Sequence, residues 1–259
     1  MDIYTLGIDS GSTYTKGALF DGEKVTQTYK IRTSAKPKES IYLVYKNLYS
    51  DKVKYTVTTG YGRNLLKESN KQITEITCHA QGAAFLNSNT RTIIDLGGQD
   101  CKVIKLDKSL NVMDFIMNDK CAAGTGRFIE VMMRLLEEDM CNIDNFVKGK
   151  NKVDISSMCT VFAESEIISL LSRDTDRGDI ALGILHSIAK RTANFARRLK
   201  PEGDIFFTGG LANSTSFKNI LSEYLKENIM THDLSQYAGA IGAAVVGYKK
   251  YNSMNKIVL

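Results

Sequence analysis

Apolar residues recur along the chain with the spacings of both helices and strands. The segment 126–138 carries them three and four positions apart, which indicates an amphipathic helix. Short apolar runs at 3–8, 91–94 and 204–207 predict buried strands instead. The same criteria predict further strands at 16–20, 54–58 and 102–106 and further helices at 41–48, 164–171, 180–199, 216–227 and 236–248.

One strand–turn–strand pattern occurs twice in the first 110 residues or so. A strand at 3–8 leads into an Asp-Ser-Gly-Ser-Thr turn, and a strand at 91–94 leads into an Asp-Leu-Gly-Gly-Gln-Asp turn. Asp, Gly and Lys fall at the same relative positions in both copies, at Asp9, Gly11 and Lys16 and again at Asp95, Gly97 and Lys102. Such self-similarity predicts two halves built on one plan.

The residue types in these turns suit a Mg²⁺–triphosphate. Glycines let backbone N–H groups approach an anion closely, and small hydroxyl residues add donors. Aspartates at the strand ends, Asp9 and Asp95, provide oxygen ligands for Mg²⁺, directly or through water. An ordinary hairpin corner explains a single Asp-Gly turn equally well, but two matched copies favour the phosphate site. The predicted phosphate-holding residues are Gly11, Ser12, Thr13, Lys16, Gly97 and Gly98.

A third glycine-rich turn, Thr208-Gly209-Gly210, ends the strand at 204–207. Together these features resemble the actin, Hsp70 and hexokinase superfamily, in which Gly209 and Gly210 would form the adenosine motif. The resemblance implies an α/β fold of two ribonuclease-H-like domains hinged around ATP. We expect one domain over 1–90, with the helix at 236–250 packing back on it, and a second over 91–235.

Composition narrows the functional class. Hydrophobic residues make up 43% and charged residues 24%, which excludes a disordered or fibrous chain. The net charge of +5 is spread along the sequence and does not call for nucleic acid. The absence of a signal-like N-terminus or an 18-residue apolar run predicts a cytoplasmic protein without membrane contact.

Five cysteines, an odd number, argue against a disulfide framework and leave free thiols or metal and cluster ligands. Cys121 and Cys159 each precede a predicted helix, whose electropositive N-terminus with free N–H groups would favour a thiolate. Spacing alone equally suits two buried thiols. A [4Fe–4S] cluster normally takes four thiolates, which a two-fold homodimer with two from each chain would provide.

Several phrases resemble the BadF/BadG/BcrA/BcrD ATPase family, and above all the activators of 2-hydroxyacyl-CoA dehydratases. They are the segments 59–63, 78–80, 95–100, 118–128 and 159–166. The resemblance implies a homodimeric, oxygen-sensitive ATPase in which Cys121 and Cys159 hold one shared [4Fe–4S] cluster. Reduced ferredoxin or flavodoxin would load one electron, and ATP would drive its transfer to a dehydratase-type radical enzyme.

Other polar residues complete the expectation. Gln99 is a candidate for orienting the attacking water, by analogy with glutamines of other NTPases, or else a turn residue bonded to backbone. Lys102 is expected to face solvent or a neighbouring carboxylate. His79, His186 and His232 have no evident partners in the sequence and are interpreted as structural.

Two alternative functions stay open. A small-molecule kinase of the same superfamily would need a carboxylate as general base, for which Asp100 or Asp119 would serve. An electron-transfer ATPase could instead act on a benzoyl-CoA reductase or on a double-cubane-cluster protein.

Overall fold

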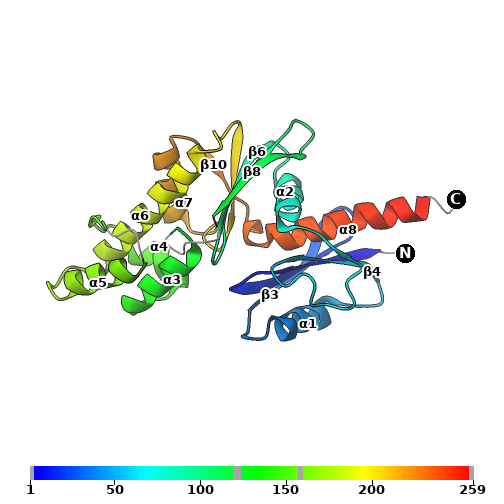
Figure 1. Ribbon diagram of the computed structural model, residues 1–259, viewed down its shortest axis with the longest axis horizontal. Helices are drawn as coiled ribbons and strands as arrows, with labels where there is room; N and C mark the ends of the chain where they lie inside the picture. The colour runs from blue at the N-terminus through cyan, green and yellow to red at the C-terminus, as the bar shows by residue number, and fades with distance from the viewer. Residues whose placement is uncertain (1–2, 119–123, 157–159, 257–259) are drawn as a thin grey trace.

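The chain folds around two five-stranded mixed sheets of the same topology (Figure 1). The computed structural model describes residues 3–118, 124–156 and 160–256. The first sheet has the order β3-β2-β1-β4-β5 and the second the order β8-β7-β6-β9-β10. The strands are β1 (Tyr4–Ser10), β2 (Tyr14–Phe20), β3 (Val25–Arg32), β4 (Val53–Gly60), β5 (Lys71–Gln72), β6 (Thr90–Leu96), β7 (Cys101–Leu106), β8 (Val112–Asn118), β9 (Asp204–Gly209) and β10 (Ile229–Met230).

The repeat predicted from the sequence is present in the register of the strands. β1 pairs antiparallel with β2 and parallel with β4, and β6 pairs antiparallel with β7 and parallel with β9. Asp9 lies opposite Lys16 in the first sheet, as Asp95 lies opposite Lys102 in the second. The prediction of two halves with one plan is therefore confirmed.

Two helices lie between the sheets, one packed on each sheet and both packed against each other (Figure 1). α8 (Ala238–Lys256) packs on β1, β2 and β4, and α2 (Glu75–Leu86) packs against α8 and against β6 and β7. The α2–α8 approach requires glycine, because a Cβ on Gly242 would lie 1.7 Å from the carbonyl oxygen of Cys78. The opposite face of the first sheet is covered by α1 (Pro37–Leu48).

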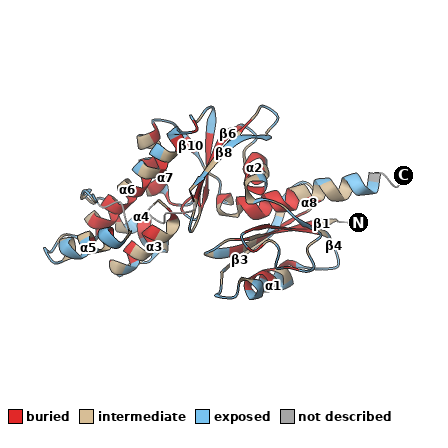
Figure 2. Cartoon of the chain, viewed as in Figure 1, coloured by how far each residue is buried: buried red, intermediate tan, exposed pale blue. Residues whose placement is uncertain are grey.

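The largest apolar core belongs to the second half, where helices cover the far face of its sheet (Figure 2). These elements are α3 (Gly126–Leu135), η1 (Met140–Asn142), α4 (Ile143–Phe146), α5 (Thr160–Leu171), α6 (Arg177–Arg197) and α7 (Thr215–Leu225), and the turn η2 (Ser235–Tyr237) precedes α8. Within the described residues, no helix combines the length and the apolar character that crossing a membrane requires.

Among the longer elements the sequence patterns missed β3, β8 and α2, and they also missed the short elements β5, β10, α4, η1 and η2. β3 and β8 are outer strands with many exposed positions, so neither shows a buried apolar run. α2 is rich in Ala, Gly and Thr and is packed between the two halves, so it has no single apolar stripe. The helix predicted at 126–138 ends at Leu135, and the one predicted at 164–171 begins at Thr160.

Candidate functional site

A cavity of about 680 Å³ lies between the two strand–turn–strand units. The residues predicted to hold phosphates, Mg²⁺ and adenosine all line it: Asp9, Gly11, Ser12, Thr13, Lys16, Asp95, Gly97, Gly98, Gly209 and Gly210. Gln99 is exposed and is not among the lining residues. The fold thus brings ten predicted residues together around one space and leaves the predicted water-orienting residue outside it.

The two turns predicted to hold phosphates, 9–13 and 95–100, are named the first and second phosphate turn after that prediction, and they touch each other. A Cβ on Gly98 would lie 2.1 Å from Thr13 Oγ1, so only glycine allows this approach. The first turn is fastened from behind by Thr33, whose N–H donates to the Thr13 carbonyl (2.8 Å) and whose hydroxyl donates to the Gly11 carbonyl (2.9 Å). The contact between Gly98 and Thr13 and the two hydrogen bonds of Thr33 together fix how far apart the two turns lie.

The carboxylate of Asp95 is buried, and each of its two oxygens accepts one hydrogen bond. Thr208 Oγ1 donates to its Oδ1 (2.8 Å), and Lys102 Nζ donates to its Oδ2 (3.1 Å). Burial works against the charge, but His79, Lys102 and Thr208 together hold the pKa of Asp95 well below its usual range. Asp95 is therefore a carboxylate at every pH at which the protein would work.

Lys102 is buried beneath three carboxylates and does not face solvent. Its Nζ lies 2.8 Å from Asp100, 3.1 Å from Asp95 and 3.9 Å from Glu75. Burial disfavours the ammonium, yet these three groups raise the pKa of Lys102 above its ordinary value. The expectation of a carboxylate partner is confirmed, and that of a solvent-facing lysine is wrong.

Lys16, the matching residue of the first turn, has a different environment. It is partly buried, and no carboxylate of the described residues lies within ion-pair distance of its Nζ. Burial lowers the pKa of Lys16, and Asp9 and Asp95 oppose this from further away. A cation without a close counter-ion at the wall of a cavity is suited to bind an anion.

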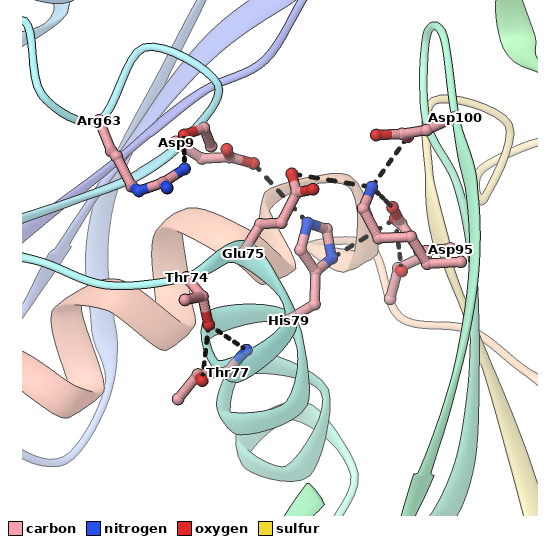
Figure 3. A network of polar contacts seen from close by, with 11 residues as sticks. Asp9, Arg63, Thr74, Glu75, Thr77, His79, Asp95 and Asp100 are labelled. Atoms are coloured by element: carbon pink, nitrogen blue, oxygen red, sulfur yellow. Dashed lines mark hydrogen bonds and ion pairs between the residues drawn. The ribbon is translucent and has the colours of Figure 1, made fainter. Parts of the chain in front are cut away.

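α2 adds two residues that the sequence patterns missed, His79 and Glu75 (Figure 3). His79 is buried between the two turns, with Nε2 3.9 Å from Asp9 Oδ2 and Nδ1 3.4 Å from Asp95 Oδ1. Its Nδ1 has no hydrogen-bond partner among the described residues, so the site has a buried polar atom available to a ligand. The expectation that His79 lacks partners is wrong, because its partners come from distant segments.

Glu75 stands one helical turn before His79 and also lines the cavity. Burial raises the pKa of Glu75, while Lys102 opposes the shift. A carboxylate with a raised pKa beside a cavity is a candidate proton acceptor. The only signal in the sequence was its spacing of four from His79, which places both on one helix face.

His186 and His232 lie away from the cavity and fit the structural interpretation. His186 Nδ1 lies 3.2 Å from the Tyr224 hydroxyl, and His232 Nδ1 accepts from the backbone N–H of Leu234 at 3.0 Å.

The far end of the cavity is shaped by the turn after β9. Gly209 has φ of +101°, and a Cβ there would lie 2.1 Å from the carbonyl oxygen of Leu96. Asp144 of α4 accepts from Ser214 Oγ (2.7 Å) and from the backbone N–H groups of Thr215 and Ser216 (3.0 Å each). The cavity therefore continues beyond the phosphate turns between two walls that are bonded to each other.

The proposed cluster ligands Cys121 and Cys159 lie outside the described residues, as does Asp119. Cys78 and Cys101 are buried free thiols, and burial raises the pKa of each to about 12. Cys141 is an exposed free thiol. These three cysteines are thus distributed as separate thiols and form no cluster with one another.

The segment that contains Cys121 joins α3, whose first turn is bonded to the second phosphate turn. The backbone N–H of Gly126 donates to the Gly97 carbonyl (2.9 Å), and that of Arg127 donates to the Gly98 carbonyl (2.8 Å). The expectation of free N–H groups at this helix start is therefore wrong for these two donors. They tie the helix to two glycines that line the cavity.

Sequence comparison places the chain among known proteins. The model of the BadF/BadG/BcrA/BcrD ATPase family matches residues 6–247. The chain is 44% identical over 258 residues to the (R)-2-hydroxyglutaryl-CoA dehydratase activating ATPase of Acidaminococcus fermentans, covering 96% of this chain and 99% of that protein. It is 30% identical to one of the subunits of the benzoyl-CoA reductase of Thauera aromatica, covering 98% and 96% of the two chains.

Structural comparison agrees. The activator of the 2-hydroxyisocaproyl-CoA dehydratase from Clostridium difficile, solved with bound ADPNP, matches with a TM-score of 0.93 and 39% identity over 99% of this chain and 98% of that one. A ROK family glucokinase from Streptomyces griseus matches with a TM-score of 0.60 and 13% identity over 95% and 99%, which shows a common fold alone. The predicted fold, an α/β fold of two ribonuclease-H-like halves as in the actin, Hsp70 and hexokinase superfamily, is confirmed, and the chain belongs to the BadF/BadG/BcrA/BcrD ATPase family.

Proposed function

We propose that this protein is an ATP-dependent one-electron-transfer activator of a 2-hydroxyacyl-CoA dehydratase-type radical enzyme. Two chains would hold one [4Fe–4S] cluster through Cys121 and Cys159 of each. The observation that carries the proposal is the bonding of α3 to the second phosphate turn, because it links the nucleotide cavity to the segment of Cys121. The dehydratase activators among the relatives support the choice of partner.

The cavity residues have the chemistry that ATP hydrolysis needs. Lys16 would neutralise a terminal phosphate, and Gly98 would supply a backbone donor. The N–H groups of Gly11 and Gly97 already donate to the carbonyls of Tyr14 and Asp100, so these two glycines would serve by letting the backbone approach closely. Asp9 and Asp95 would hold Mg²⁺, directly or through water, and the ion would neutralise charge that develops on the phosphates. His79 Nδ1, which has no hydrogen-bond partner among the described residues and lies 3.4 Å from Asp95 Oδ1, fits this set because a protonated ring nitrogen can donate to a phosphate oxygen.

Two residues compete for the role of orienting or deprotonating the attacking water. Gln99 is the candidate from the sequence. Its side chain is exposed, and it is not among the residues that line the cavity. Glu75 lines the cavity, and burial raises its pKa above the ordinary value. We therefore add Glu75 to Gln99 as a candidate for this role.

Nucleotide binding would act on the cluster through backbone contacts. Phosphates bound between the turns would change the spacing of Gly98 from Thr13, and Gly97 and Gly98 would shift the first turn of α3 with them. In this proposal residues 1–90 with helix 236–250 move as one domain and residues 91–235 as the other. For a one-electron couple about 59 mV corresponds to roughly 1.4 kcal/mol, so nucleotide binding energy can alter a cluster potential substantially.

A reduced ferredoxin or flavodoxin of the cytoplasm would be the electron donor. The alternative electron acceptors are a benzoyl-CoA reductase and a double-cubane-cluster protein. One relative is a subunit of a benzoyl-CoA reductase, which favours the reductase of these two. Mixing the reduced protein and ATP with purified dehydratase or reductase components separates the two, because only the true acceptor gains activity.

Iron analysis of single variants tests the proposal. The anaerobically purified protein is expected to be a brown dimer with about four irons, and Cys121→Ser or Cys159→Ser to lose the iron while still binding ATP. Cys141→Ser is the matched control, because this exposed thiol should leave the iron content unchanged. A colourless, iron-free chain that phosphorylates a sugar would show the kinase alternative to be correct. That alternative would have to free Asp100 from Lys102, 2.8 Å away.

A further inference from the structure

An ion pair joins the two halves at the wall of the cavity. Arg32, the last residue of β3, donates from Nη2 to Oε1 of Glu130 on α3. Both residues line the cavity. Glu130 is also paired within its own helix, because Arg127 Nη1 donates to its Oε2 (2.9 Å) and Arg134 Nη2 lies 3.6 Å from its Oε1.

Each end of this ion pair is attached to one phosphate turn. Thr33, which follows Arg32, is hydrogen-bonded to the carbonyls of Gly11 and Thr13 in the first turn. α3, which carries Glu130, starts with the two N–H groups that donate to the second turn. The ion pair therefore closes a ring that runs through both turns and around the space for phosphates.

We propose that Arg32 and Glu130 are positioning residues that form a strap across the cavity, holding the two phosphate turns together and coupling nucleotide occupancy to the first turn of α3. The inference rests on the proposed function in that a nucleotide fills the cavity. Arg32 has 58% of its side chain exposed, so the strap opens easily. When Arg32 moves away, Glu130 keeps Arg127 and Arg134 as partners. Opening the strap therefore does not leave the Glu130 carboxylate without a counter-ion.

A double-mutant cycle on the full-length chain measures the strap. Arg32→Gln and Glu130→Gln should each weaken binding of a non-hydrolysable ATP analogue with Mg²⁺ about two- to fivefold, the range for a partly exposed ion pair. The double variant should lose no more than either single variant. High salt should remove the differences. Arg127→Gln is the matched control, because it removes another partner of Glu130 without opening the ring.

Hydrogen exchange of the first turn of α3 gives a second readout. In the nucleotide-bound protein, Arg32→Gln should speed exchange in this turn about threefold, the same order as the loss expected for a partly exposed ion pair, and Arg32→Lys should restore part of the protection. Equal losses for Arg32→Gln in the wild-type and Glu130→Gln backgrounds would mean that Arg32 acts on the nucleotide itself, which overturns the strap. Unchanged affinity in Arg32→Gln, or the same loss in Arg127→Gln, overturns it too.

Neither the affinity for the ATP analogue nor the hydrogen exchange of α3 depends on iron. A failure of the strap can therefore be distinguished from a failure of the electron-transfer proposal. An iron-free chain in which the cycle shows coupling contradicts the electron-transfer proposal and leaves the strap intact. An iron-loaded chain without coupling contradicts the strap alone.

Discussion

The two phosphate turns have the same strand register and opposite electrostatics. In the first, Asp9 and Lys16 face a cavity, and Lys16 lacks a close counter-ion among the described residues. In the second, Asp95 and Lys102 are each 2% exposed and bonded to each other. The two copies of the Asp–Lys pattern therefore differ in surroundings: Lys16 lines the cavity, whereas Lys102 is held by buried carboxylates.

The difference comes from what packs beside each turn. Lys102 lies next to the N-terminal turn of α2 and to Asp100, which supply two more carboxylates. The first turn has small hydroxyl residues, Ser12 and Thr13, at its tip, and these leave the space in front of Lys16 open. The Asp–Lys pattern in the sequence therefore predicts where each lysine lies in its sheet. The residues packed around a lysine decide whether it faces the cavity or pairs with buried carboxylates.

Substitution of each lysine should separate the two turns most strongly, through the free energy of unfolding. Lys102→Met leaves Asp95 and two other carboxylates without their shared cation and should lower the free energy of unfolding by about 3–5 kcal/mol. Lys16→Met should change it by less than about 1 kcal/mol, because no close ion pair is lost. Urea denaturation of both variants measures this. Equal losses would contradict the proposed division of roles between the turns.

The next effect concerns hydrolysis. Glu75→Gln should slow ATP hydrolysis about a hundredfold with little change in ATP affinity, the usual effect of removing a general base. Gln99→Ala should slow it about tenfold or less, since this side chain is exposed. Single-turnover phosphate release with matched affinity measurements separates the two steps. A larger loss for Gln99→Ala would favour this residue over Glu75 as the group that orients the water.

A smaller effect tests the contact between the turns. The new Cβ of Gly98→Ala would lie 2.1 Å from Thr13 Oγ1, so the turns must separate and affinity for a Mg²⁺–ATP analogue should fall about tenfold. In Gly97→Ala the Cβ meets the Asp100 carboxylate within one turn, so the loss should be less. Titration calorimetry compares the two variants. The opposite ranking would show that the contact between turns is unimportant for binding.

The smallest effect uses Cys101, which corresponds in register to Thr15 of the first turn. Burial raises the pKa of Cys101 to about 12, and an unfolded thiol ionises near a pH of about 8.5. The unfolded chain therefore releases this proton first, and stability falls as the pH rises above about 8.5. Cys101→Thr should lessen the loss between about pH 8 and pH 9.5 by about 1 kcal/mol in denaturation experiments. An unchanged pH slope would contradict the buried position of this thiol.

The cavity residues that were easiest to predict from the sequence are those whose place depends on local backbone conformation. Gly98 and Gly209 stand out in the sequence because tight turns and close approaches need glycine, and both line the cavity. Glu75 and His79 were missed as site residues because α2 has no periodic stripe and because their partners lie in distant segments. No spacing rule along one chain reports such contacts.

The order of amino acids is enough to predict the repeat, the strand ends that carry Asp9 and Asp95, and the glycines of the turns, because strand register and backbone freedom are local properties. The packing of the folded chain sets the rest: Lys102 is internal while Lys16 faces the cavity, His79 lies between the two aspartates, and Arg32 reaches Glu130. These depend on how two sheets and the helices between them pack, and burial and charge at a given side chain are set by those neighbours.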